Sequence, residues 1–128
     1  MTGNKVLLDT NIMFELFKGY NSIEAFLEDQ ENIYIATAVL AELFLGAYRS
    51  TRVQKHLQEV KDFLLKCTVL FADETTAENY AIIKTALLQK GKPIPENDVW
   101  IAATAMQHQL LLYTNDKHFH EVQGISLI

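Results

Sequence analysis

The run Val6-Leu7-Leu8-Asp9-Thr10-Asn11 constrains the fold of this chain more than any other stretch. Its three consecutive apolar residues predict a short strand that is buried on both faces, as strands in the middle of a parallel sheet are. The strand ends in Asp9, and residues 12–18 then predict an amphipathic helix that ends at Gly19. Ligands of open α/β sheets bind beyond the carboxyl ends of the strands. Asp9 is therefore either a functional residue at that edge or a simple N-cap of the helix.

Strands and helices alternate along the rest of the chain. Further strands are predicted at residues 32–36, 68–72, 110–113 and 125–128. Further helices are predicted at residues 22–28, 38–48, 52–66, from about 73 to about 90, and 97–107. Ser22 and Thr37 are the predicted N-caps of the first two. Asp73 or Thr75 is the predicted N-cap of the helix that ends near residue 90, with a possible capping box between Thr75 and Glu78. This alternation predicts an α/β fold in which helices cover both faces of a parallel sheet.

The composition fits one folded domain over residues 1–128. Hydrophobic residues make up 49% of the chain and charged residues 21%, which is enough apolar material for a real core. No apolar run reaches the roughly 20 residues that span a bilayer, so we expect neither a signal peptide nor membrane contact. Cys67 is the single cysteine, which excludes an internal disulfide and fits a cytoplasmic location; its apolar neighbours favour a packing role.

The net charge of −5 argues against a protein that holds nucleic acid by overall basic charge. It does not exclude a nuclease, because acids that bind metal ions count toward this total and the ions reverse the local sign.

Glu42 is the second acid that the pattern singles out. Between Ala38 and Tyr48 it is the only charged residue, and a helix that is apolar all round is buried. A carboxylate on such a helix must be paired, bound to metal or turned toward a cleft. Gly46, one turn later, would let another segment approach the helix closely. Glu15 has Lys18 three residues away as a partner, so we expect no functional role for it.

Two further acids lie where the same edge of the sheet is expected. Asp98 falls in the first turn of the helix at 97–107, where a capping role is the simple alternative. The small residues Ile101-Ala102-Ala103 would press this helix start against the sheet. Asp116 closes the cluster Thr114-Asn115-Asp116, which follows an apolar strand just as Asp9 does. If the two strands are neighbours, Asp9 and Asp116 face each other.

Four converging carboxylates need a positive partner. Each like-charged pair at about 4 Å costs roughly 4 kcal/mol at an effective dielectric near 20. Oxygen ligands select Mg²⁺, with Mn²⁺ as a substitute, and the four histidines form no zinc pattern, so a metal role for a histidine is not expected. Such a cluster can orient a phosphate and activate a water molecule, which predicts metal-assisted phosphodiester hydrolysis. Thr114, Asn115 and Asn11 are candidate helpers that orient carboxylates or water.

These motifs, in this order, resemble the PIN-domain ribonucleases, and in particular the VapC-type toxins of bacterial and archaeal toxin–antitoxin pairs. The resemblance rests on Leu7 to Asn11, Ala41-Glu42-Leu43 with Gly46, the stretch from Gly91 to Asp98 with Ile101-Ala102-Ala103, and Thr114-Asn115-Asp116 with Phe119. It covers essentially the whole chain.

The resemblance implies a three-layer α/β/α sandwich, usually paired into a homodimer, with Mg²⁺-dependent endonucleolytic activity on RNA. It makes Asp9, Glu42, Asp98 and Asp116 the metal-binding catalytic acids, and Thr114 or Asn115 a polar helper. It also implies a small VapB-like antitoxin that covers the acidic site, commonly with an arginine among the carboxylates.

Other interpretations are a non-catalytic α/β binding module whose acids only cap helices, and a nuclease of the same fold that acts on DNA or on a particular nucleic-acid structure. A haloacid-type phosphatase requires a second acid two residues after Asp9, where this chain has Asn11.

Overall fold

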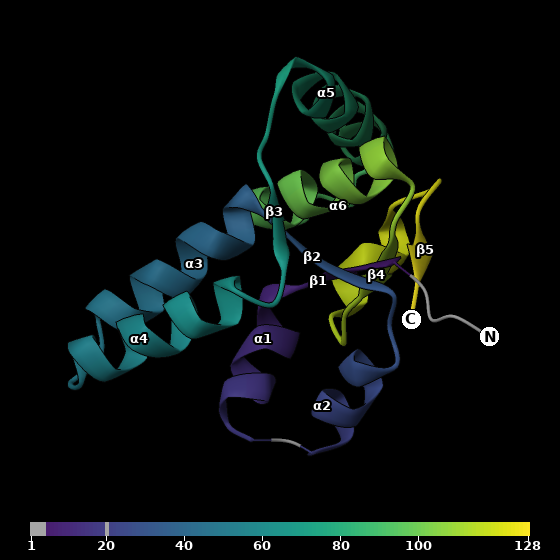
Figure 1. Cartoon of the computed structure of the whole chain (residues 1–128). Helices are drawn as coiled ribbons and strands as arrows, with labels where there is room; N and C mark the ends of the chain where they lie inside the picture. Colours follow the sequence, from purple (N-terminus) through teal and green to yellow (C-terminus); the bar gives the residue numbers. More distant parts are fainter. Residues whose placement is uncertain (1–4, 20) are drawn as a thin grey trace.

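The computed structural model describes residues 5–19 and 21–128 (Figure 1). Its strands are β1 (Lys5–Leu8), β2 (Asn32–Ala36), β3 (Thr68–Leu70), β4 (Leu111–Tyr113) and β5 (Ser126–Leu127). Its α-helices are α1 (Thr10–Phe17), α2 (Asn21–Glu28), α3 (Thr37–Tyr48), α4 (Val53–Leu64), α5 (Glu74–Gln89) and α6 (Glu96–His108), and a short 3₁₀ helix, η1 (Lys117–Glu121), follows β4.

The five strands form one parallel sheet in the order β3-β2-β1-β4-β5. The chain builds outward from β1 to β3 on one side and then returns to place β4 on the other side of β1. The order therefore reverses between β1 and β4, which is the position where open α/β sheets bind ligands. Leu8 pairs with Tyr113, so Asp9 and Thr114 emerge side by side at the carboxyl edge.

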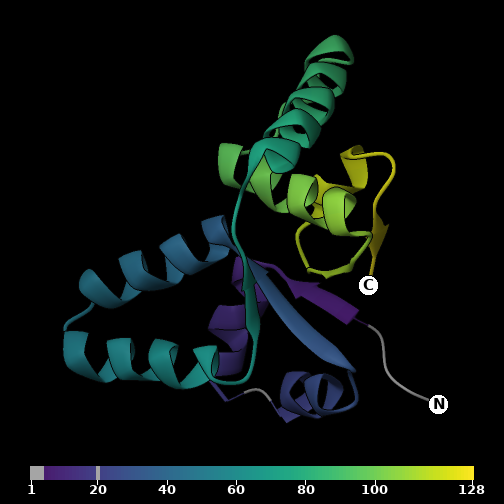
Figure 2. The ribbon, with the colours of Figure 1, turned by 45° about the horizontal axis from the view of Figure 1, so that its top comes forward.

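Helices cover both faces of the sheet, as the alternating pattern predicts. Helices α5 and α6 lie on one side of the sheet and α1 and α2 on the other, and α3 and α4 form an antiparallel pair that projects beyond it (Figures 1 and 2). Within residues 5–19 and 21–128, no helix is long and apolar enough to cross a bilayer.

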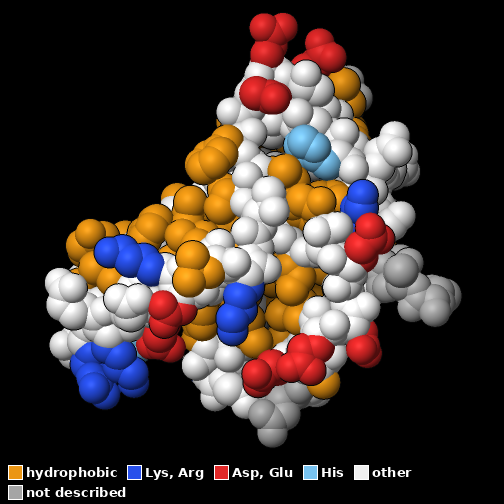
Figure 3. All heavy atoms as spheres, viewed as in Figure 1, with side chains coloured by type: hydrophobic (Ala, Val, Ile, Leu, Met, Phe, Trp, Pro, Cys, Tyr) orange, Lys and Arg blue, Asp and Glu red, His pale blue; other side chains and the backbone are white. Residues whose placement is uncertain are grey.

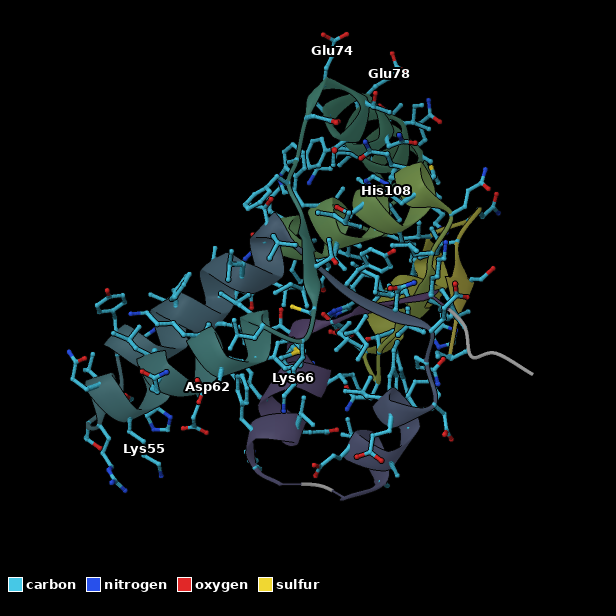
Figure 4. The ribbon with its side chains drawn as sticks, in the orientation of Figure 1. Lys55, Asp62, Lys66, Glu74, Glu78 and His108 are labelled. Carbon is cyan, nitrogen blue, oxygen red and sulfur yellow. The ribbon has the colours of Figure 1, made fainter. Side chains whose placement is uncertain are left out.

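The core is centred on β1, whose Val6, Leu7 and Leu8 are completely inaccessible to solvent. Helix α6 packs closely on the sheet because Ala102 and Ala103 are small and fully buried. Charged side chains on the outer helices, such as Lys55 and Asp62 on α4, point away from the ribbon in Figure 4. Because α6 packs closely on the sheet, its first turn lies near the carboxyl ends of β1 and β4.

Two packing predictions agree with the structure. At Gly46 the ring of Phe14 from α1 does approach α3 closely, and an added methyl group would lie 3.4 Å from it, which is an ordinary contact distance that an alanine could also accept. Cys67 is half-buried, and burial raises the pKa of its thiol to about 11, which keeps it protonated and unreactive.

The predicted elements all exist, but several predicted caps are wrong. Helix α1 begins at Thr10, two residues earlier than predicted, but its N-cap is Asp9, as the capping alternative predicts. Ser22 lies inside α2 rather than before it. The hydroxyl of Thr37 accepts a hydrogen bond from the amide of Ala72 at 3.0 Å instead of capping α3, because the loop after β3 passes alongside.

At α5 the N-cap is Asp73, one of the two predicted candidates, but the capping box joins Asp73 and Thr76, not Thr75 and Glu78. Thr76 is fully buried, and Gln107 of α6 binds both members of the box, so a tertiary contact selects this pairing. The predicted ends of α4, β3 and β5 extend one or two residues too far, since chain ends fray where side chains lose their burial.

Candidate active site

The four predicted acids line one open cleft at the carboxyl edge of the sheet. Its volume is about 480 Å³, and Thr10, Asn11 and the segment Pro95-Glu96-Asn97 complete its walls. The acids come from four separate segments: Asp9 follows β1, Glu42 lies on α3, Asp98 lies in the first turn of α6, and Asp116 follows β4. Only the fold brings them together.

Asp9 and Asp116 are held by the same hydroxyl. Thr114 Oγ1 donates to Asp9 Oδ2 at 2.7 Å and accepts from the backbone amide of Asp116 at 2.9 Å. Asp9 Oδ1 also accepts from the backbone amide of Thr10 at 2.7 Å. Asp9 is 2% exposed and is fixed in one orientation, so it caps α1 and faces the cleft at the same time. Thr114 has the orienting position that the sequence predicts.

Glu42 is half-buried and reaches across the cleft to α6. Its Oε1 accepts a hydrogen bond from the side-chain amide of Asn97 at 2.9 Å. Asn97 belongs to the first turn of α6, next to Asp98, where asparagine would ordinarily be expected to help cap the helix. The structure instead shows it holding the carboxylate of another segment, a contact that no pattern within either helix could reveal.

Asp98 and Asp116 share a histidine as neighbour. His118 Nδ1 lies 3.0 Å from Asp116 Oδ1 and 3.4 Å from Asp98 Oδ2. Asp116 caps η1 by accepting the backbone amide of His118 at 2.9 Å, and this turn places the imidazole over the two acids. The sequence contains no zinc pattern, so no metal role is expected for this histidine, although it lies only two positions after Asp116.

Burial and neighbouring negative charges raise the pKa values of two acids of the cleft, Asp9 and Asp98. Burial raises the pKa of Asp9, the negative charges of Asp116 and Glu42 add to this rise, and the hydrogen bonds from Thr114 and Thr10 oppose it. Burial raises the pKa of Asp98 to about 6, with further contributions from the charges of Asp9 and Asp116, while His118 acts in the opposite direction. Carboxylates whose ionised form is disfavoured in this way bind cations readily.

The donor set fits a hard divalent cation. Four carboxylates supply the oxygen ligands that Mg²⁺ and Mn²⁺ prefer. Thr10 lines the cleft, and its hydroxyl is buried and has no hydrogen-bond partner among the described residues. A buried orphan hydroxyl beside carboxylates suits a water molecule of an ion's hydration shell. The residues present are therefore suited to hold such an ion.

Asn115 and Glu15 contact each other, which differs from what the sequence predicts for either of them. The side-chain amide of Asn115 donates to Glu15 Oε1 at 2.9 Å and does not line the cleft, so the structure does not bring it to the acids. Glu15 thus has Asn115 as its partner, rather than the Lys18 that the sequence suggests. Glu96 does line the cleft, but its carboxylate accepts from Lys84 Nζ at 2.7 Å and from the hydroxyl of Tyr80, so its charge is compensated locally.

Comparison with known proteins identifies the family. The family model described as PIN domain matches residues 6–125, which include all four acids of the cleft. The chain belongs to the PIN-domain family. Its relatives there include ribonuclease VapC2 of Haemophilus influenzae, 32% identical over 88% of this chain and 86% of the relative. The tRNA(fMet)-specific endonuclease VapC of Shigella flexneri is 30% identical over 94% of both chains.

Solved structures agree with this placement within the PIN family. The structure of DNA-bound VapBC from Salmonella typhimurium superimposes with a TM-score of 0.90 at 29% identity, covering 100% of this chain and 98% of that one. The expected parallel α/β sandwich is therefore confirmed, and within the PIN family the chain is a VapC-type ribonuclease toxin.

Proposed function

We propose that this PIN domain is a Mg²⁺-dependent endoribonuclease that cleaves structured RNA and is silenced by a small VapB-like antitoxin. The observation that carries the proposal is the convergence of Asp9, Glu42, Asp98 and Asp116 on one cleft at the switch point of the sheet. An ion bound there would polarise the scissile phosphate and activate a water molecule for attack. Asp9, Asp98 and Asp116, with Glu42, would hold that ion.

The neighbouring side chains set the geometry of the acids. Thr114 fixes Asp9 and Asp116 relative to each other through one hydroxyl, and Asn97 keeps Glu42 turned into the cleft. Such fixed positions lower the reorganisation needed when a phosphate arrives. Mn²⁺ would substitute for Mg²⁺, since both take oxygen ligands in octahedral geometry.

An antitoxin partner fits the charge of the cleft. VapBC complexes are among the structural neighbours of this chain. A basic side chain placed among the carboxylates would relieve their mutual repulsion in the way that a metal ion does, and would exclude the ion and the RNA together. We propose that the partner acts in this way, in the cytoplasm where both molecules would meet the RNA.

A homodimer is supported by apolar side chains that remain exposed. Leu45 and Tyr48 on α3, Phe71 after β3, and Ile82 and Leu88 on α5 are each more than half exposed. Figure 3 shows apolar side chains gathered over α3 and β3 on one face. Exposed apolar patches of this kind commonly mark a protein interface. Light scattering of the purified chain would show a dimer, and Phe71→Lys would shift it toward monomer.

The decisive test is cleavage of total RNA by the purified chain, with and without Mg²⁺, next to Asp9→Asn. The proposal predicts cleavage only when both the metal and Asp9 are present, and inhibition when the antitoxin is added. Single-stranded and duplex DNA serve as parallel substrates. Cleavage of DNA instead of RNA would favour the DNA-directed alternative, and metal-independent cleavage would contradict the proposed chemistry.

A further inference from the structure

His118 is the histidine that lies beside two acids of the cleft, Asp98 and Asp116. Its Nδ1 faces Asp98 and Asp116, and one ligand atom from each of the three residues lies within 4.8 Å of the others. Its side chain is 52% exposed, so the imidazole contributes little to the core. Its position over two acids therefore needs an explanation other than packing.

The distances match those between ligands that share one ion. Ligand atoms about 2.1 Å from a metal, at adjacent positions of an octahedron or tetrahedron, lie roughly 3.0–3.4 Å apart. His118 Nδ1 lies 3.0 Å from one carboxylate oxygen and 3.4 Å from the other. The three ligand atoms all lie within 4.8 Å of one another, so an ion could contact all three groups after small movements, chiefly of the exposed His118 side chain.

The backbone around His118 is well anchored. Asp116 accepts the amide of His118, and Thr114 accepts the amide of Asp116, so the turn into η1 is fixed by two side-chain hydrogen bonds. The next residue, Phe119, is completely buried and fastens η1 to the core. A donor on an anchored turn loses little freedom when it binds an ion.

A nitrogen ligand changes which ions the site prefers. Mg²⁺ takes oxygen ligands and gives up its water reluctantly, whereas imidazole is a good ligand for transition-metal ions. We propose that His118 is a nitrogen ligand, together with the carboxylates of Asp98 and Asp116, for a divalent transition-metal ion such as Mn²⁺, which the site then binds in preference to Mg²⁺. This proposal rests on the metal dependence proposed above and adds the identity of the ion and one ligand.

The opposing explanation is that His118 acts as an imidazolium counter-ion for the two acids. The two explanations predict different effects of His118→Gln. If the imidazole is only a counter-ion or hydrogen-bond partner of the acids, its loss would change the affinities for Mn²⁺ and Mg²⁺ to the same extent, because it contacts neither ion. Loss of a nitrogen ligand lowers the affinity for Mn²⁺ while that for Mg²⁺ hardly changes. The ratio of the two affinities separates them.

The experiment uses the full chain at about pH 8, where an ordinary histidine is neutral. Calorimetric titration with Mn²⁺ and with Mg²⁺ compares the parent, His118→Gln and His120→Gln. His120 lies two residues further along η1 and is exposed, so it is the matched control. We expect His118→Gln to weaken Mn²⁺ binding by about tenfold or more and to change Mg²⁺ binding by less than about twofold. His120→Gln should match the parent for both ions.

Pulsed electron paramagnetic resonance of the bound Mn²⁺ provides a readout independent of affinity. A directly coordinated imidazole gives a nitrogen-14 modulation, which we expect in the parent and in His120→Gln and not in His118→Gln. Parent Mn²⁺ without nitrogen modulation, or equal changes in the affinities for both ions, would overturn the proposal. Mg²⁺-dependent RNA cleavage measured on the same samples would then show that the nuclease proposal stands without it. A parent that binds no Mn²⁺ and cleaves no RNA would overturn both.

Discussion

Asp9 and Asp73 are both aspartates at the N-cap of an α-helix, but their pKa values are shifted in opposite directions. The pKa of Asp73 is lowered because its carboxylate accepts hydrogen bonds from Thr76 and Gln107 in an exposed position. The pKa of Asp9 is raised because it is buried and faces other acids. One aspartate is stabilised as an anion by its surroundings, and the other is not.

The difference shows what each helix start contributes. At α5, Asp73, Thr76 and Gln107 satisfy one another, so this cap fastens α5 to α6 and stabilises the fold. At α1, the cap is combined with a cleft of carboxylates that repel one another when no cation is present. Clustered groups that oppose folding are typical of functional sites. Asp9 thus does cap α1, as the capping alternative predicts, and its place among the acids of the cleft supports the metal-binding role that we propose for it.

The largest expected effect separates the two aspartates by activity. Asp9→Asn should keep the fold and reduce RNA cleavage by about 100-fold or more, because the carboxylate that would hold the ion becomes a neutral amide. Asp73→Asn should cleave like the parent. Gel assays of RNA cleavage in Mg²⁺, with circular dichroism to confirm folding, measure this. Equal cleavage by Asp9→Asn and the parent would show that the site is assigned wrongly.

The next effect concerns stability without metal. The pKa of Asp98 is about 6 in the folded chain, against an ordinary value of 3.8, so folding favours its protonated form. The parent should therefore lose stability as the pH rises from about 4 through 6. In chelator at about pH 7, Asp98→Asn should raise the free energy of unfolding by about 1–2 kcal/mol, after allowance for solvent screening, and at about pH 4 the gain should vanish. Urea denaturation at both pH values measures it, and a gain independent of pH would contradict this account.

A substitution in the capping box at α5 should lower stability, whereas Asp98→Asn should raise it. Asp73→Ala should lower Tm by a few degrees, because the amide of Thr76 and the side chain of Gln107 lose their acceptor. Since the pKa of Asp73 is lowered, the stability it contributes is present above its ordinary value of 3.8 and is lost as the pH falls below it. Thermal melts near pH 7 and pH 3 check this, and RNA cleavage should not change.

The smallest effect is expected at Glu42. Glu42→Gln should raise Tm slightly in metal-free buffer, because repulsion within the cleft falls while the new amide oxygen can still accept the hydrogen bond from Asn97. Added Mg²⁺ should stabilise the parent more than the variant. A lower Tm for Glu42→Gln in chelator would mean that Asn97 needs a charged partner and that Glu42 has a structural role.

Much of the fold could be predicted because its signals are local. The apolar run before Asp9, the uncharged neighbourhood of Glu42 and the Thr-Asn-Asp cluster at 114–116 follow directly from strand and helix periodicity. The sequence leaves open whether the strands before Asp9 and Thr114 are neighbours. The structure pairs them as β1 and β4, which places Asp9 and Thr114 side by side.

The parts that could not be predicted depend on contacts between distant segments. Asn97 binds Glu42 across 55 positions, and Asn115 turns to Glu15 across 100. Neither choice is visible within a helix or a strand, because an amide side chain can bind whichever acceptor the fold brings close. His118 likewise lies beside Asp98 only because the fold brings two separate segments together.

We propose that Asp9, Glu42, Asp98 and Asp116 form one metal-binding site. The most direct test of this proposal is a crystal of the full chain soaked in Mn²⁺ and measured for anomalous scattering. We predict an anomalous peak in the cleft between these acids, and its loss in Asp9→Asn. An empty cleft with Mn²⁺ bound elsewhere, or a peak that is unchanged in Asp9→Asn, would contradict the account.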